Sequence, residues 1–379
     1  MPSSTIPHRQ SKPADHADGL LELFNLVPDP RMPRGTRHPL AVVLAAALAA
    51  VLSGARSYAA IGQWADSVDG EVAGELGLVR RPEASTFRRV LTALDTAAFD
   101  VLTGAWLWLR CVQASGMNII SFDGKTVRGA TTAGRRAPHL LAAMVHGTDT
   151  VVAQVRVGEK TNEIPALRDL VKRLAIEGWL VIADALHTQR DTAQAIIEAG
   201  AGYLLTVKRN QPGLLARCAA LPWTRIPHQT SVDRSKGRRV RRTIKVCDAD
   251  AWADFPHAAQ IAQLRRTRTE RGRKTVEVVY LICSLPAAQA TPAQIGRWIQ
   301  AHWRIENRVH WIRDVCFDED RQTAHSGNGP EAMAALRNLA ISLLRLNGAA
   351  NIAAALRHNA YHPEHVLLIL LTSRKETLP

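Results

Sequence analysis

Short β-type runs alternate with helical segments through the middle of the chain, and this alternation constrains the fold more than any other feature. From Met117 onward, apolar runs of strand length such as NIISFDGK, TVVAQVRVG and GYLLTVK are separated by the helical patterns ALRDLVKRLAIEG and TQRDTAQAIIEAG. Strands that alternate with helices imply a mixed sheet covered by helices. We therefore predict an α/β domain over residues 116–350, built on a mixed sheet flanked by helices.

The segments around this sheet differ from it in composition and pattern. Residues 1–18 are polar and predict a disordered leader, whereas residues 19–115 have helical periodicity and predict an N-terminal helical domain. Residues 214–285 include the basic β-type stretches SVDRSKGRRVRRTIKV and LRRTRTERGRKTVEVVYLICSL, which predict a β-rich insertion in the sheet domain. Residues 351–379 predict a C-terminal tail with a short amphipathic helix. The apolar run at 39–54 is shorter than the ~20 residues that cross a bilayer, so we expect a buried helix there.

The charge balance points to a polyanionic partner. Lys and Arg number 48 against 34 Asp and Glu, which gives a formal charge of +14. Nucleic acid is favoured over a membrane because the basic residues are spread over the chain, without a lipid-anchoring motif or a basic amphipathic helix. The arginines of the helical domain and of the insertion are candidates for phosphate contacts, and a solvated basic surface is the alternative.

The cysteines and the first residues bear on the cellular compartment. The five cysteines never form a CxxC pattern, so neither a zinc ribbon nor a CxxC redox motif is present. They are expected to be small buried side chains in a reducing compartment. The first residues lack the apolar stretch of a secretory signal, so a cytoplasmic protein is expected.

Two carboxylates stand at the ends of two predicted strands. Asp123 ends the apolar run NIISFD, and Asp184 ends the run WLVIAD. In open α/β sheets ligands collect beyond the strand ends, and carboxylates there can hold hard cations through oxygen. Taken singly, an aspartate at a strand end is more often a turn former or a helix cap than a metal ligand.

A third carboxylate lies on the helix predicted from Thr291. His302, Glu306, His310 and Arg313 follow one another at spacings of 4, 4 and 3, on a different face from the apolar stripe. The alternative is an ordinary solvated helix face. Three carboxylates on separate elements suit a pair of Mg²⁺ ions, or Mn²⁺ ions, that promote an in-line displacement at phosphorus.

Several long motifs in this order resemble a known family. They are PDPRMPRGTRHPLAVVLAAALAAVLSGARSYAAIGQWA, SFDGKTVRGA, EKTNEIPAL, IADALHTQRDTAQAI, GYLLTVKRNQP and HWRIENRVHWIRDVCFDEDR. The chain resembles the DDE transposases of bacterial insertion sequences of the H-repeat-associated type, whose catalytic domain is ribonuclease H-like. The match runs from about Leu21 to Leu346.

The resemblance implies roles for particular residues. Asp123, Asp184 and Glu306 would be the catalytic residues and the ligands of two Mg²⁺ or Mn²⁺ ions, with the β-rich insertion between the last two. The residues expected to contact DNA are Lys125, Arg128, Lys160, His187, Lys208, Asn210, Gln211, Arg238, Arg242, His302 and Arg313. The last two stand near Glu306, where the wider superfamily often has an arginine and a lysine.

The function implied by the resemblance is DNA transposition. Such a protein binds the terminal inverted repeats of its element, cuts the double-stranded DNA there and joins the ends to a target, as a homodimer because two ends are processed together. We expect it in the cytoplasm, associated with the nucleoid and not with a membrane. Two alternatives remain open: a metal-dependent DNA nuclease without strand transfer, and a domesticated DNA-binding regulator without catalysis.

Overall fold

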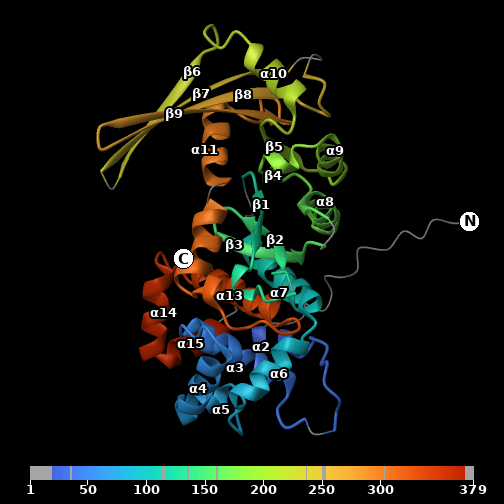
Figure 1. Cartoon of the computed structure of the whole chain (residues 1–379), viewed down its shortest axis with the longest axis vertical. Helices are drawn as coiled ribbons and strands as arrows, with labels where there is room; N and C mark the ends of the chain where they lie inside the picture. The colour runs from blue at the N-terminus through green and yellow to red at the C-terminus, as the bar shows by residue number, and fades with distance from the viewer. Residues whose placement is uncertain are drawn as a thin grey trace, which may run out of the picture. The chain divides into compact units, whose positions relative to one another are not determined.

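The protein is described by a computed structural model (Figure 1). The residues described are 19–34, 36–112, 116–134, 136–158, 161–235, 237–249, 253–302 and 304–371. The chain forms two compact units. Unit 1 comprises Met1–Gln113, Gly124–Arg156 and Glu306–Pro379, and unit 2 comprises Ala114–Asp123 and Val157–Ile305. Two of the points at which the chain passes between the units therefore fall next to the carboxylate candidates Asp123 and Glu306.

Helices dominate unit 1. They are α2 (Leu20–Phe24), α3 (Leu40–Leu52), α4 (Tyr58–Ser67), α5 (Gly70–Glu75), α6 (Ala84–Ala93), α7 (Thr96–Cys111), α12 (Trp311–Val315), α13 (Gly329–Leu346), α14 (Ile352–Tyr361) and α15 (Pro363–Leu371). Local sequence starts several of them, because Ser57, Asp69 and Asp95 accept hydrogen bonds from the first backbone amides of α4, α5 and α7.

Two of these helices form the core of unit 1. The residues of α3 from Val43 to Leu52 are buried, which confirms the buried helix predicted for the apolar run. Helix α13 is buried from Gly329 to Leu344 and packs on α3, α6 and α7. Against it also lies a hairpin of antiparallel strands, β2 (His139–Val145) and β3 (Thr150–Arg156).

The apolar helices of unit 1 invite a test for membrane spans. Among the described residues, no single helix is long and apolar enough to cross a membrane. Only taken together do α6 and α7 have the length and composition of a membrane span, and the pair is bent by 90° at the break between the two helices.

Unit 2 is built on a mixed sheet. Its strands are β1 (Ile119–Thr126, whose last three residues belong to unit 1), β4 (Leu180–Ala183), β5 (Gly202–Val207), β6 (His228–Ser235), β7 (Arg238–Asp248), β8 (Gln260–Glu270) and β9 (Arg273–Cys283). They are ordered β1-β4-β5-β9-β8-β7-β6. The β1–β4 and β4–β5 pairs are parallel, and the remaining pairs are antiparallel. The predicted mixed α/β architecture is therefore present.

The helices of unit 2 cover this sheet. They are α8 (Glu163–Arg173), α9 (Arg190–Glu198), α10 (Pro212–Ala220) and α11 (Pro292–His302). Helix α11 inserts Ile295, Trp298 and Ile299 into an apolar cluster with strand residues such as Ile182 and Leu264. It therefore covers one face of the sheet, and this cluster is the core of unit 2.

In two segments the structure adds detail that the sequence does not predict. The basic strands of the insertion are continuous with the main sheet, because β9 pairs with β5 through Tyr280–Cys283 and Leu204–Val207. The helix predicted from Thr291 is not a regular α-helix throughout, because the π-helical turn η4 (Glu306–His310) lies between its first part, α11, and α12. Such turns are rare and occur mostly as single insertions in α-helices, often at functional sites.

A glycine in α7 offers a test of the packing in unit 1. A Cβ atom on Gly104 would lie 2.1 Å from the carbonyl oxygen of Val152 in β3, whereas one on the exposed Gly74 of α5 would meet nothing within 4 Å. We expect Gly104→Ala to lower the free energy of unfolding by about 1–3 kcal/mol or more through overpacking. Gly74→Ala is expected to raise it by about 0.4–1 kcal/mol by restricting the unfolded chain. Urea unfolding of both variants checks this, and equal effects would contradict the close approach of α7 to β3.

Candidate active site

The two aspartate candidates follow neighbouring parallel strands in register. Phe122 of β1 pairs with Ala183 of β4, so Asp123 and Asp184 are the next residues on adjacent strands. Neighbouring strands lie about 4.8 Å apart, and residues at the same register point to the same face. Strand β4 ends directly before Asp184, whereas β1 continues past Asp123 to Thr126. Unit 2 therefore brings these two carboxylates together at one level of the sheet.

The face that carries the aspartates is the face covered by α11. Side chains two residues apart on a strand share a face, so Ser121 lies on the side of Asp123. The last residue of α11, His302, is buried and places its Nδ1 3.4 Å from Ser121 Oγ. Burial lowers the pKa of His302, and Asp123 and Asp184 oppose that effect by stabilising its charged form. The imidazole is thus neutral near pH 7 and close to both carboxylates.

The turn after β5 carries three further candidates. Asn210 donates a hydrogen bond from Nδ2 to the backbone oxygen of Ala185 at 2.5 Å, directly after Asp184. Gln211 donates from Nε2 to Gln189 Oε1 at 2.9 Å. These bonds tie the turn after β5 to the segment that follows β4. Lys208 on the same turn is exposed and lies close enough to His302 to lower its pKa.

Of the remaining candidates of unit 2, His187 is buried, Arg242 is paired, Arg238 is exposed and Lys160 is not described. His187 is 1% exposed, and its Nε2 lies 3.2 Å from Glu163 Oε2, so it holds α8 to the segment after β4 and has little surface for DNA. Arg242 pairs with Asp233 across β6 and β7. Arg238 is exposed at the start of β7. Lys160 lies outside the described residues.

In unit 1, Glu306 lies at the start of the π-helical turn. Its Oε2 is 3.3 Å from His310 Nδ1. The hydrogen bond with His310 lowers the pKa of Glu306, and Lys125 and Arg128 add to this effect while partial burial opposes it. The Glu306 side chain is 67% exposed, whereas that of His310 is 3% exposed. Glu306 is therefore an accessible, ionised carboxylate whose orientation is fixed by a buried histidine.

Lys125 is held by a neighbouring acid. Its Nζ donates to both carboxylate oxygens of Asp314 at 2.8 and 2.7 Å. The exposed Arg128 begins a short 3₁₀ turn, η1 (Arg128–Ala130), that packs on a second one, η5 (Glu319–Arg321). The backbones of η1 and η5 lie close together, since a Cβ atom on Gly129 would lie 2.4 Å from the backbone oxygen of Glu319.

Arg313 is part of a buried ion network and not of an exposed helix face. Its guanidinium and that of Arg337 both bind Glu319, at 2.8 and 3.0 Å, and all three side chains are 0% exposed. Burial raises the pKa of Glu319, but the two guanidinium groups more than reverse this and hold the pKa at about 2. Because Arg313 is buried against this partner, it has no surface to offer to DNA.

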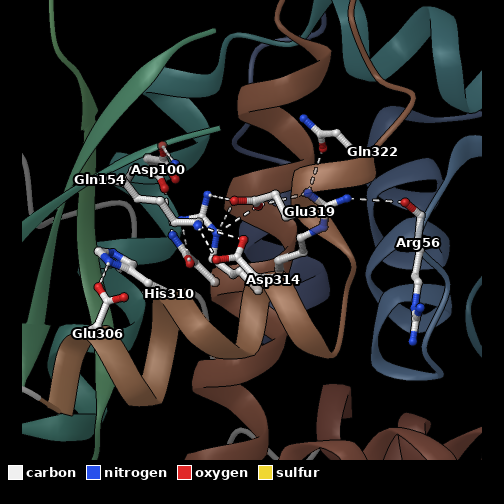
Figure 2. A network of polar contacts seen from close by, with 12 residues as sticks. Arg56, Asp100, Gln154, Glu306, His310, Asp314, Glu319 and Gln322 are labelled. Atoms are coloured by element: carbon white, nitrogen blue, oxygen red, sulfur yellow. Dashed lines mark hydrogen bonds and ion pairs between the residues drawn. The ribbon is translucent and has the colours of Figure 1, made fainter. Parts of the chain in front are cut away.

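Figure 2 shows how this network extends through the core of unit 1. On one side Arg337 donates to Gln322 Oε1 at 2.8 Å and to the backbone oxygen of Arg56 at 3.3 Å. On the other side Asn338 donates to Gln154, and Gln154 donates to Asp100, whose burial raises its pKa to about 8. Polar side chains from distant parts of the sequence thus meet beneath the segment that carries Glu306.

Sequence reasoning gave no role to several of these residues. Glu319 belongs to the motif HWRIENRVHWIRDVCFDEDR, where only the carboxylate at 306 was singled out. Arg337 in the amphipathic α13 gave no signal beyond its position among buried apolar residues. An arginine amid a buried apolar stripe requires a counterion, and that requirement was the available clue.

Comparison with known proteins gives matches over most of the chain. The family described as "Transposase DDE domain" matches residues 114–343, and the family described as "DDE_Tnp_1-associated" matches residues 21–107. "H repeat-associated putative transposase YhhI" of Escherichia coli (strain K12) is 28% identical over 351 residues, which cover 86% of this chain and 90% of that protein. "Putative transposase YncI" of Escherichia coli O157:H7 is 28% identical over 350 residues, with 86% and 87% covered. A solved piggyBac transposase synaptic complex with hairpin DNA aligns with 94% of this chain and 78% of its own at a TM-score of 0.44 and 10% identity.

The buried network predicts a large, pH-dependent effect on stability. Glu319→Gln leaves two buried guanidinium groups without a counterion, so we expect the free energy of unfolding to fall by about 3–5 kcal/mol near pH 7. Because folding lowers the pKa of Glu319 from 4.5 to about 2, its contribution is present above about pH 4.5 and is lost as the pH falls towards 2.

Denaturant unfolding of wild type and variant between pH 2 and 7 measures this difference. The matched control is Asp191→Asn, which removes the partner of Arg168 from a pair whose aspartate is 82% exposed. We expect it to cost about 0–1 kcal/mol. A Glu319→Gln cost that is small, or that persists unchanged at pH 2, would contradict the ion network.

Proposed function

Since this chain belongs to the DDE transposases, of the H-repeat-associated type, we propose that it binds the terminal inverted repeats of its insertion sequence, cleaves DNA there and joins the ends to a target. The single observation that carries this proposal is the register of β1 and β4, which places Asp123 and Asp184 side by side beneath α11. Ribonuclease H-like architecture of the catalytic domain is part of the same proposal, supported by this mixed sheet.

We further propose that Glu306 acts with the two aspartates as a ligand of two Mg²⁺ or Mn²⁺ ions. The family is generally dependent on divalent metal ions. The donor set fits, because all three groups are carboxylates and hard cations prefer oxygen ligands. The lowered pKa of Glu306 keeps that carboxylate ionised and able to bind a cation. When bound, such ions activate the attacking oxygen and stabilise the leaving oxygen of a phosphodiester.

The surrounding side chains have supporting roles in this proposal. Neutral His302 adds no positive charge beside the aspartates. Its Nδ1 faces Ser121, which leaves Nε2 to donate or accept a hydrogen bond with substrate or water. Exposed Lys208 is available for a phosphate at the same end of the sheet. His310 acts as a positioning residue, since it fixes the Glu306 carboxylate.

Isosteric substitutions test the proposed carboxylates. In Asp123→Asn, Asp184→Asn and Glu306→Gln, we expect Mg²⁺-dependent cleavage of DNA carrying the matching repeats to fall at least about 100-fold, since even second-shell partners of metal sites contribute about 10–100-fold. DNA binding should be retained. Asp191→Asn, which changes an exposed carboxylate of unit 2, is the control and should cleave like wild type. Activity that survives in any one of the three variants would remove that residue from the site.

The products distinguish the proposal from its alternatives. A transposase leaves donor 3′ ends covalently attached to target DNA, whereas a nuclease releases free ends. A regulator would bind the repeats without cleaving them, and its binding would be unchanged in Asp184→Asn. Recovery of joined molecules with wild-type protein is the expected result, and cleavage without joining would favour the nuclease.

A further inference from the structure

The four long strands β6–β9 have two faces of different character. Ile244 of β7 pairs with Leu264 of β8, and both belong to the apolar cluster beneath α11. Paired residues share a face, and residues two apart on a strand share it too. These rules divide the four strands into a helix face, which contains Ile244 and Leu264, and an open face, which contains the alternate residues. Figure 1 shows α11 against these strands and α10 near their other side.

The acidic side chains of these strands all fall on the helix face. Ion pairs on this face join Arg242 to Asp233, Arg266 to Glu277 at 2.6 Å, and Arg268 to Glu270. The register supports this assignment, because Arg266 and Glu277 are directly paired residues of β8 and β9. The arginines of the helix face are therefore largely neutralised by neighbouring carboxylates. This applies to Arg242, which we expected from the sequence to contact DNA, and its neighbour at the strand start, Arg238, lies across from Glu270 on the same face.

The open face carries positive charge alone. Its cations are Arg234, Arg239, Arg241, Lys245, Arg265 and Lys274, and none of the alternate residues on this face of the four described strands is Asp or Glu. Lys245 donates to the backbone oxygen of Trp223, which covers the end of the face nearest α10. Beyond that end, Val232, Val276 and Val278 are 44%, 47% and 45% exposed, so the face is open to solvent.

Charge and dimensions together indicate the partner. A second copy of this face would be repelled, because both surfaces are cationic. Double-stranded DNA carries one negative charge per about 1.7 Å of its axis and suits a surface with several unneutralised cations. With strands about 4.8 Å apart, the cations are distributed over about 14 Å from β6 to β9. This is close to the about 12 Å width of the major groove, which is bordered by both phosphate backbones.

We propose that the open face of β6–β9 is the surface on which this protein holds the phosphate backbone of double-stranded DNA, through Arg239, Arg241 and Arg265. The inference rests on the proposed function, and it replaces Arg242 and Arg238 of the helix face as the backbone contacts of the insertion. Phosphate contacts carry no sequence information directly, so this surface contributes affinity to every duplex alike.

Two triple variants with equal loss of charge test the proposal. The open-face variant is Arg239→Ala, Arg241→Ala and Arg265→Ala, and the helix-face variant is Arg242→Ala, Arg266→Ala and Arg268→Ala. Binding of a labelled duplex is measured by fluorescence anisotropy without divalent metal, between 50 and 200 mM salt. For the open-face variant we expect the Kd to rise about 10-fold or more and the slope of log K against log salt to fall by about 2–3, since each phosphate contact contributes about 0.9. The helix-face variant should stay within about threefold of wild type.

Other outcomes would overturn the proposal. Equal weakening by both variants would mean that net charge alone matters, and a larger effect of the helix-face variant would reverse the assignment. Wild-type binding by the open-face variant, together with a changed sedimentation coefficient, would assign the face to contacts between copies of the chain. Circular dichroism and thermal unfolding confirm folding, and single Arg241→Glu and Arg242→Glu variants provide the same comparison if a triple variant misfolds.

This experiment is independent of catalysis. Face-dependent binding by a protein that never cleaves DNA would leave the inference standing while the proposed function fails. If the wild-type protein cleaves DNA but the two triple variants bind the duplex equally well, the inference fails while the proposed function stands. Failure of wild type to bind any duplex would reject both.

Discussion

Parallel pairing of β1 with β4 is the constraint on which the candidate active site depends. Backbone hydrogen bonds fix the two strands at one register, from Ile119 beside Leu180 to Phe122 beside Ala183. Each strand is buried up to the position of its aspartate, and Ile119 and Ile182 belong to the apolar cluster beneath α11, so the carboxylates stand where that cluster ends. A slip of one residue would turn one aspartate to the opposite face of the sheet, and the pair would be lost. The apolar core thus determines the position of the acidic pair.

A second constraint operates in unit 1, where Glu319 is fully buried between two arginines. A buried carboxylate is unfavourable by itself, and here the attraction of Arg313 and Arg337 lowers its pKa despite the burial. The network joins the segment after α12 to α13 and reaches Arg56 before α4. The accessible Glu306 therefore belongs to a segment that is anchored, a few residues further on, by charges hidden from solvent.

Exposure and pairing with acids separate the basic residues into three groups with different physical roles. Arg313 and Arg337 are structural, since buried guanidinium groups with a bound carboxylate have no surface for a ligand. Arg242 and Arg266 are exposed in part but paired with acids. The cations of the open face have no acid beside them on that face, and a surface of that kind attracts polyanions over a distance set by salt. The large formal charge of the chain is therefore not distributed evenly over its surface.

The sequence by itself determined the mixed α/β architecture, the buried helix at Leu40–Leu52, the membership of the transposase family and the positions of Asp123 and Asp184 after apolar runs. These features follow from local patterns of apolar and polar residues, or from motifs that are continuous along the chain. Tertiary structure alone decided that β9 joins the main sheet, that a π-helical turn begins at Glu306, and that Arg313 is buried while Glu306 is exposed. It also decided which arginines of β6–β9 stand beside acids. The reason is that burial and strand register arise from pairings between residues far apart in sequence, and the spacing of residues along one segment does not encode those partners.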